Sequence, residues 1–144
     1  MIRNAVITDS SAIQQLNKYQ LGYDYPSTKT AKNLKRLLSD SQHHYIFVFE
    51  DDITKKVNGY VHAEIYEETY FDQMFNILAL AVNTSFQKKE IGKQLMLKLE
   101  EKARELCISE IRLNSGESRL GAHQFYENLG YITNKKQKRF SKKL

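Results

Sequence analysis

Apolar residues in the first forty positions recur at helical spacing. Residues 3–7, which end in Ala-Val-Ile, predict a short opening strand, and residues 8–11 then supply the N-cap chemistry of a helix that Gly22 ends. A loop containing Pro26 leads to a second helix, for which Ser27 and Thr28 are the predicted caps. The predicted apolar faces are Ile13, Leu16 and Tyr19 in the first helix and Ala31, Leu34, Leu37 and Leu38 in the second.

The pattern then changes to that of strands. Residues 45–49 are aromatic or β-branched, and residues 57–66 return as the second arm of a hairpin after a polar turn at 51–56. Residues 77–82, Ile-Leu-Ala-Leu-Ala-Val, are continuously apolar, which is typical of a strand buried on both faces. The segment between the last two strands, residues 67–76, is expected to be a connection.

The remaining elements alternate between helix and strand. A long helix is predicted from about Glu90 to Leu106, a short strand at 110–113, and a last helix at 118–129 that Gly130 ends. A final strand or strand pair is expected from Tyr131. The predicted inward residues are Ile91, Leu95, Leu99 and Ala103 in the long helix, and Ala122, Phe125, Tyr126 and Leu129 in the last. This order predicts one α+β domain over residues 1–144, with a mixed sheet.

Composition narrows the protein class. No apolar run approaches the roughly 20 residues that span a bilayer, and the first residues lack the apolar stretch of a secretion signal. The only cysteine, Cys107, excludes an internal disulfide, suits the cytoplasm and is expected to be a small buried hydrophobe. The adjacent His43 and His44 would point to opposite sides of a strand, and no metal site is expected.

The net charge of +5 is concentrated at one end of the chain. Residues 132–144 carry six basic residues and no acid, and removing these six leaves 16 basic against 17 acidic residues. A nucleic-acid-binding face would spread positive charge over the domain, so neither a nucleic-acid nor a membrane partner is expected.

The most informative segment is the strand at 77–82 followed by a polar loop and a helix with Gly92 in its first turn. A helix N-terminus presents unpaired N–H groups and partial positive charge, and glycine lets an anion approach the backbone. Lys88, Lys89 and Lys93 add positive charge at the same turn. These features favour phosphate binding, with an ordinary capped helix and solvated lysines as the alternative.

Two segments resemble motifs of the GNAT superfamily of N-acetyltransferases, and the order and length of the predicted elements agree with that family over nearly the whole chain. Residues 87–92, Gln-Lys-Lys-Glu-Ile-Gly, match the signature Q/R-x-x-G-x-G/A at its first and last places, with Glu90 where the family usually has its first glycine. Residues 122–131 match A-x-x-x-Y-E-x-x-G-F/Y throughout, while Arg119 stands where the family often has an asparagine.

The resemblance implies a three-layer fold whose central mixed sheet is splayed between its fourth and fifth strands and flanked by helices. It implies acetyl-CoA as co-substrate, with the amine of the acceptor attacking the thioester directly. An N–H near Leu80 or Ala81 would face the thioester carbonyl. The cofactor-binding residues that it implies are Leu80, Ala81, Val82, Gln87, Lys88, Lys89, Glu90, Ile91, Gly92, Lys93, Arg119 and Tyr126.

The resemblance also implies catalytic roles. Tyr126 matches the tyrosine that protonates the departing thiolate; packing beside Phe125 is the alternative. Some relatives place a glutamate near the start of the fourth strand, and Asn76 stands there in this chain. The proton acceptor is therefore either a water chain held by Asn76 or a nearby acid, of which Glu64 is the first candidate and Glu67, Glu68 and Asp72 follow.

Three functions remain open at this point. The first is acetyl transfer to a primary amine of a small molecule or peptide, and the acid-rich stretch 64–72 would attract such a cation. Tyr23, Tyr25, Tyr66 and Tyr70 are expected to border its cleft. The second is a catalytically weak module that binds acyl-CoA, and the third a nucleic-acid-associated protein using the basic end. A homodimer is common in the family and is possible for this chain.

Overall fold

The fold is described from a computed structural model. It describes residues 1–86 and 90–144 in full and residues 87–89 by their backbone element alone. The chain forms two compact units, residues 1–114 and residues 115–144, which are described separately.

The first unit is built on a five-stranded sheet in the order β1-β2-β3-β4-β5. The strands are β1 (Ile2–Asn4), β2 (His44–Glu50), β3 (Val57–Glu68), β4 (Phe71–Val82) and β5 (Ile111–Leu113). The first three pairings are antiparallel and the pairing of β4 with β5 is parallel. The mixed sheet predicted from the sequence is confirmed.

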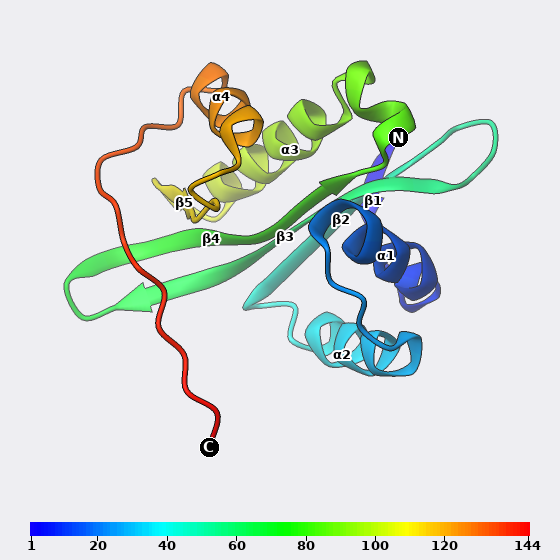
Figure 1. The fold of residues 1–144 in the computed structure, drawn as a ribbon, viewed down its shortest axis with the longest axis horizontal. Helices are drawn as coiled ribbons and strands as arrows, with labels where there is room; N and C mark the ends of the chain where they lie inside the picture. The colour runs from blue at the N-terminus through cyan, green and yellow to red at the C-terminus, as the bar shows by residue number, and fades with distance from the viewer. The chain divides into compact units, whose positions relative to one another are not determined.

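Helices cover both faces of this sheet (Figure 1). On one face, α1 (Ser10–Leu16) and α2 (Ser27–Ser39) pack against β2 and β3, and their core joins Ile13, Leu16 and Leu34 to Ile46, Val48, Tyr60 and Ala81. On the other, α3 (Ile91–Glu105) buries Ile91, Leu95, Met96, Leu99 and Ala103. A Cβ at Gly59 would lie 3.2 Å from Ile91 Cγ2, so glycine allows α3 to approach β3 closely. These are the three layers that the resemblance implies.

The first helix departs from the predicted pattern near its end. It starts with the 3-10 turn η1 (Ile7–Asp9), continues as α1 and widens into the π-helical turn η2 (Asn17–Leu21) before Gly22, whose φ is +79°. A π-helical turn departs from the 3.6-residue repeat. Tyr19 is 68% exposed, so its predicted place on the apolar face is wrong.

The long β3–β4 hairpin extends beyond the apolar core. β4 begins at Phe71 and not at Ile77, so Asp72 lies in β4 while Glu67 and Glu68 lie in β3, and none belongs to the predicted connection. Polar residues interrupt the apolar pattern of residues 67–76, although Met74 and Phe75 there are buried, and the segment was therefore assigned to a connection. The prediction of burial on both faces is also wrong in part, because Leu78 is 49% exposed and residues 79–80 are half-buried.

The C-terminal end of α3 explains the state of Cys107. Cys107 adopts φ +59°, and the N–H of Ile108 donates to Ala103 O at 2.8 Å, which is the bonding pattern of a left-handed helix cap. The buried residue at this cap is Ile108, whereas Cys107 is exposed. Its expected burial is therefore wrong.

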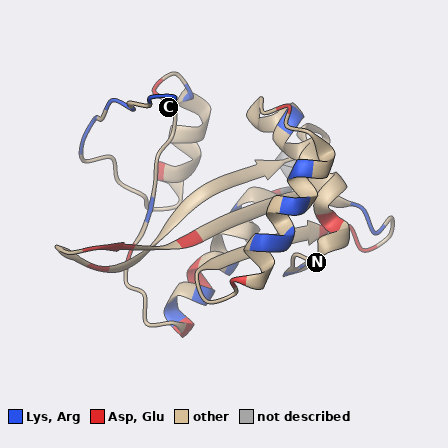
Figure 2. Cartoon of the chain, turned by 90° about the horizontal axis from the view of Figure 1, so that it is seen from below, with Lys and Arg blue, Asp and Glu red and all other residues tan. Residues whose placement is uncertain are grey.

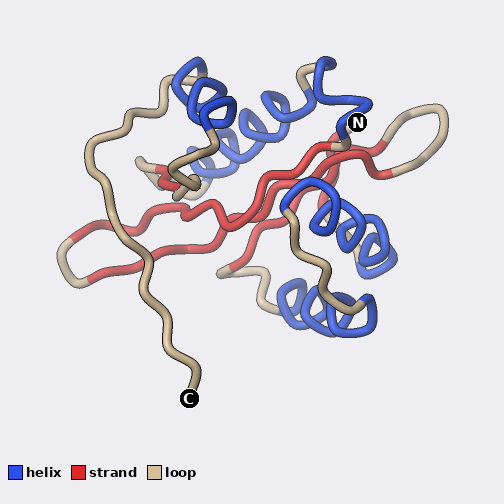
Figure 3. Tube along the Cα trace, viewed as in Figure 1, coloured by secondary structure: helices blue, strands red, loops and turns tan.

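The second unit contains α4 (Leu120–Asn128), and Gly130 ends this helix as predicted, with φ +92°. Residues 131–144 form no strand, so the predicted final strand is wrong (Figure 3). This segment holds six basic residues and no alternating apolar positions that a sheet face would bury.

Within the part of the chain that the structure describes, no helix is long and apolar enough to cross a membrane.

Candidate functional site

The sheet opens between β4 and β5. The two strands pair only where Phe75, Asn76 and Ile77 face residues 111–113. Directly afterwards the β3–β4 register shifts, because Ala63 faces Ile77 whereas His62 faces Ala79. Leu78 is therefore the extra residue of a β-bulge, and such bulges bend a strand and mark sites where pairing ends. From Leu78 onward, no described strand pairs with the β4 edge that faces away from β3.

The direction of the Leu80 amide follows from strand alternation. At the end of β4 the N–H of Asn83 donates to Asn58 O of β3 at 2.8 Å. Successive N–H groups of a strand point to opposite edges, so the Ala81 N–H also points to β3 and the Leu80 N–H points to the open edge. The Leu80 N–H is thus a backbone hydrogen-bond donor at the open edge of β4.

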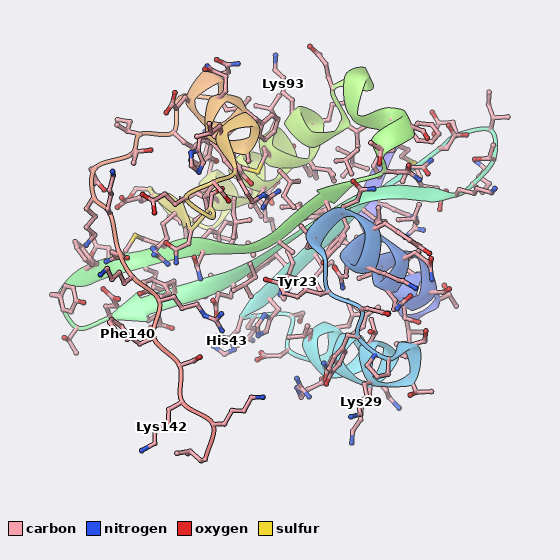
Figure 4. The ribbon with its side chains drawn as sticks, in the orientation of Figure 1. Tyr23, Lys29, His43, Lys93, Phe140 and Lys142 are labelled. Carbon is pink, nitrogen blue, oxygen red and sulfur yellow. The ribbon has the colours of Figure 1, made fainter. Side chains whose placement is uncertain are left out.

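The start of α3 presents further donors. The first bond of the helix runs from Gln94 N to Glu90 O at 3.0 Å, so the N–H groups of residues 91–93 have no partner within the helix. Lys93 is exposed, and Figure 4 shows its side chain extending outward from α3. The preceding turn η3 spans Thr84–Lys89. The predicted contacts of the Gln87, Lys88 and Lys89 side chains lie outside the described residues.

Glu90 is the N-cap of α3 and not, as the sequence predicts, a residue of the helix. Its backbone is left-handed, with φ +59° and ψ +20°, and its side chain is exposed. This region costs an L-residue roughly 1–2 kcal/mol and costs glycine little. The conformation supplies a physical reason for a glycine at this place.

We expect Glu90→Gly to raise the free energy of unfolding by about 0.5–1 kcal/mol, because relief of backbone strain exceeds the added entropy of the unfolded chain. Denaturant unfolding measures the change. Glu101→Gly, inside α3, is the matched control and should lower the free energy by about 1 kcal/mol. A loss of stability in Glu90→Gly would contradict the strained conformation.

A polar bridge crosses three strands at the point where the sheet opens. Asn76 Nδ2 on β4 donates to Glu64 Oε2 on β3 at 2.8 Å, and Arg112 Nη1 on β5 donates to Asn76 Oδ1 at 2.8 Å. The Arg112 guanidinium also lies 4.7 Å from the ring centroid of Tyr66, whose hydroxyl donates to Glu68. Glu64 faces Asn76 in the register, so all these side chains share the sheet face that α1 and α2 cover in part.

A histidine pair lies next to this bridge. His44 Nδ1 and His62 Nε2 are 3.0 Å apart, and His44 is the register partner of Glu64. Burial and then the neighbouring His44 lower the pKa of His62 to about 4, so His62 is neutral near pH 7. Among the described residues, no group of three or more His, Cys, Asp or Glu residues is placed to hold a metal ion.

The β3–β4 hairpin is acidic and aromatic. Figure 2 shows Asp and Glu residues toward the free end of this hairpin. The hydrogen bond to Glu68 raises the pKa of Tyr66 and of Tyr70, so both phenols are neutral at pH 7. Tyr23 and Tyr25 lie in the loop between η2 and α2 and are 68% and 46% exposed. The hairpin therefore offers negative charge and aromatic rings to a cation.

Tyr126 lies in the last turns of α4, in the second unit. Its ring centroid is 5.2 Å from that of Phe125 and 6.0 Å from that of Tyr131, both in edge-to-face geometry. Burial raises its pKa, while the positive charge of Arg119, the N-cap residue of α4, opposes that rise. The phenol is therefore protonated at neutral pH and remains a proton donor.

Sequence reasoning singled out Glu64 and Asn76 separately, and the structure joins them by a hydrogen bond. It missed Arg112 and His62. A period-2 reading of β3 places His62 on the same face as Glu64, and Arg112 is the one charged residue in the three-residue strand β5. Which strand lies beside Asn76 was not readable from the sequence.

Comparisons with known proteins agree on one family. The family model described as the acetyltransferase (GNAT) family matches residues 11–131. YvbK, an uncharacterised N-acetyltransferase of Bacillus subtilis strain 168, is 37% identical over 59 residues, which are 41% of this chain and 38% of the relative. The chain thus spans well under half of that relative's length.

Solved structures share the fold at low sequence identity. AAC(6')-Iy, in complex with the bisubstrate analogue CoA-S-monomethyl-acetylneamine, superposes with a TM-score of 0.85 at 16% identity over 100% of this chain and 98% of its own. Glucosamine-6-phosphate N-acetyltransferase from Arabidopsis thaliana superposes with a TM-score of 0.82 at 18% identity, over 98% of this chain and 97% of its own.

Proposed function

Because this chain belongs to the acetyltransferase (GNAT) family, we propose that it transfers an acetyl group from acetyl-CoA to a primary amine of a small-molecule or peptide acceptor. The observation that carries the proposal is the open β4 edge beyond Ile77, with the donors at the start of α3 following it in the chain. Acetyl-CoA supplies the acetyl group as a thioester.

The residues present suit the two polar parts of acetyl-CoA. The Leu80 N–H, directed to the open edge, would donate to the thioester carbonyl oxygen; strand alternation favours it over Ala81. The N–H groups of Ile91, Gly92 and Lys93 would hold the pyrophosphate at the positive end of the α3 dipole. Directly before these donors in the sequence come Gln87, Lys88, Lys89 and the exposed Glu90.

We assign Glu64 as proton acceptor for the acceptor ammonium, acting through water that Asn76 helps to hold. Asn76 lies four residues before Leu80, and a strand rises about 3.3 Å per residue, so the two positions are about 13 Å apart. A direct proton transfer over that distance is impossible, so a chain of about four ordered waters, at about 2.8 Å per hydrogen bond, would have to carry the proton. Tyr126 is the proposed donor to the departing thiolate, with Arg119 beside it in sequence at the α4 N-cap.

The acidic hairpin favours an acceptor with more than one positive charge. Glu67 and Asp72 are exposed there, and residues 66, 68 and 70 add two phenols and a carboxylate. One structural neighbour is named a glucosamine-6-phosphate N-acetyltransferase, and another was solved with an acetylneamine analogue; both point to small amines. A homodimer is proposed by family resemblance.

Release of free thiol from acetyl-CoA, measured over a panel of polyamines, aminosugars and peptides, tests the function directly. We expect at least one cationic amine to accelerate release over the rate without acceptor. In parallel, CoA should raise the melting temperature, since a native-state ligand at a hundredfold excess over its Kd stabilises by about 2.7 kcal/mol. Absence of any shift at millimolar CoA would contradict the cofactor assignment.

A second candidate is an acyl-CoA-binding module with little catalysis. The observations that favour it are Glu90 in place of the usual glycine and Asn76 in place of a glutamate. This candidate predicts the melting-temperature shift without thiol release for any amine. The Glu64 carboxylate bonded to Asn76 argues for the enzyme, since it returns a carboxylate to that place from the neighbouring strand.

A further inference from the structure

Arg112 is the charged residue at the centre of β5, a strand of three residues with Ile111 and Leu113 on either side. Its side chain is half-buried and lies on the sheet face shared by Asn76 and Glu64. It donates to Asn76 Oδ1 at 2.8 Å and to Asn114 Oδ1 at 3.2 Å, and its guanidinium lies 4.7 Å from the Tyr66 ring centroid. Three neighbours therefore hold the guanidinium in one orientation.

These contacts decide which way the Asn76 amide points. A guanidinium has donors and no acceptor, so the Asn76 oxygen must face Arg112. Nδ2 then faces Glu64 and donates to Oε2 at 2.8 Å, which is the arrangement that an ionised carboxylate accepts. A rotated amide would place its oxygen against the carboxylate and its NH₂ against the guanidinium, losing both bonds.

We propose that Arg112 is a positioning residue for acetyl transfer: through the Asn76 amide it orients the Glu64 carboxylate that accepts the proton. The inference rests on the proposed function and deepens it. The interposed amide engages one carboxylate oxygen, Oε2, and separates the guanidinium from Glu64, so Arg112 acts on the carboxylate through Asn76. Glu64 is thus held in place while it remains a proton acceptor.

Two other roles for Arg112 make different predictions. A guanidinium that bound an anionic group of the acceptor would act on the KM for the acceptor and leave kcat largely unchanged. An arginine that only packs on Tyr66 would act on stability, independently of Glu64. In the proposed role, substitution of Arg112 lowers kcat, and it does so only in a protein that keeps the Glu64 carboxylate.

A double-mutant cycle separates these roles in the full-length protein, with acetyl-CoA and the best amine of the panel. We expect Arg112→Met and Glu64→Gln each to lower kcat about tenfold, and the double variant also to lie about tenfold below wild type. The KM for the amine and the CoA-induced shift in melting temperature should stay within about twofold and 1 °C. Arg112→Lys, which keeps one donor to Asn76, should recover most of kcat.

The matched control is Arg36→Met, because Arg36 also donates to an asparagine, Asn33 Oδ1 at 3.3 Å, but on the exposed side of α2. It should leave kcat unchanged. If Arg112→Met does not fold, Asn76→Ala removes the same bridge and must show the same tenfold loss and the same non-additivity with Glu64→Gln.

Three outcomes would overturn the inference. These are a hundredfold loss in the double variant, a loss confined to the KM for the amine, and full activity of Glu64→Gln. A wild-type protein that releases no thiol with any amine would instead refute the proposed function itself, and the two failures are therefore distinguishable.

Discussion

Tyr126→Phe is expected to lower kcat by more than tenfold, toward the hundredfold that a general acid typically contributes. The departing thiolate needs a proton, and burial raises the pKa of Tyr126 so that the phenol keeps its proton at neutral pH. Phenylalanine retains the ring and its contacts with Phe125 and Tyr131, so the melting temperature should change by less than about 2 °C. Steady-state kinetics, a CoA titration and thermal unfolding on the same variant measure the three quantities.

Tyr131→Phe is the matched control, since it removes the hydroxyl of a neighbouring ring whose centroid lies 6.0 Å from that of Tyr126. It should leave kcat within about twofold. Full activity of Tyr126→Phe would reduce Tyr126 to a packing residue of α4 and leave the fold and the cofactor proposal unaffected.

The largest expected effect on stability comes from Asp9. Its carboxylate accepts from Arg3 Nη1 at 2.8 Å, Arg3 Nη2 at 3.0 Å and the Val6 N–H at 2.8 Å, with only 6% of the side chain exposed. Arg3 also donates to Glu50 Oε2 at 2.7 Å, which joins β1, η1 and β2. Asp9→Asn should lower the free energy of unfolding by about 3 kcal/mol, because the buried carboxylate loses its charge beside the half-buried Arg3 guanidinium.

The pH dependence identifies the cause. Burial by itself disfavours the charged form, but the bonds from Arg3 and Val6 outweigh it and lower the pKa of Asp9 below its ordinary value of 3.8. A carboxylate whose pKa is lower in the folded state stabilises the fold at pH values above its unfolded-state pKa. That stabilisation is lost as the pH falls through its folded-state pKa. The difference between wild type and Asp9→Asn should therefore be constant above about pH 5 and shrink below pH 4.

Glu101→Gln serves as the control for Asp9→Asn, because Glu101 pairs with Lys98 at 3.3 Å on the exposed side of α3. Exposed pairs contribute about 0–1 kcal/mol, so the loss should be small at every pH. A difference between wild type and Asp9→Asn that persisted unchanged at pH 3 would show that Asp9 acts by shape and not by charge.

The spacing of apolar residues along the chain predicted most of the helices and strands. The α3 stripe of Ile91, Leu95, Leu99 and Ala103 is confirmed, because a helix buries every third or fourth residue and these positions repeat by four. The strands predicted at residues 45–49 and 57–66 are likewise confirmed and lie within β2 (His44–Glu50) and β3 (Val57–Glu68), since aromatic and β-branched residues pack well on a half-buried sheet. The ends of β3 and β4 within residues 67–76 escaped prediction because polar residues interrupt the apolar pattern there.

The two motifs at residues 87–92 and 122–131 identified the family and the turn before α3, because they match the family's motif spacing even where overall sequence identity to relatives is low. Only the tertiary structure decided the rest of the candidate site. The Leu78 bulge depends on the register between β3 and β4, and the bridge from Arg112 through Asn76 to Glu64 consists of hydrogen bonds between residues 36 and 12 positions apart. Local pattern determines which face a side chain takes, but which strand lies beside it is determined by the packing of the whole sheet.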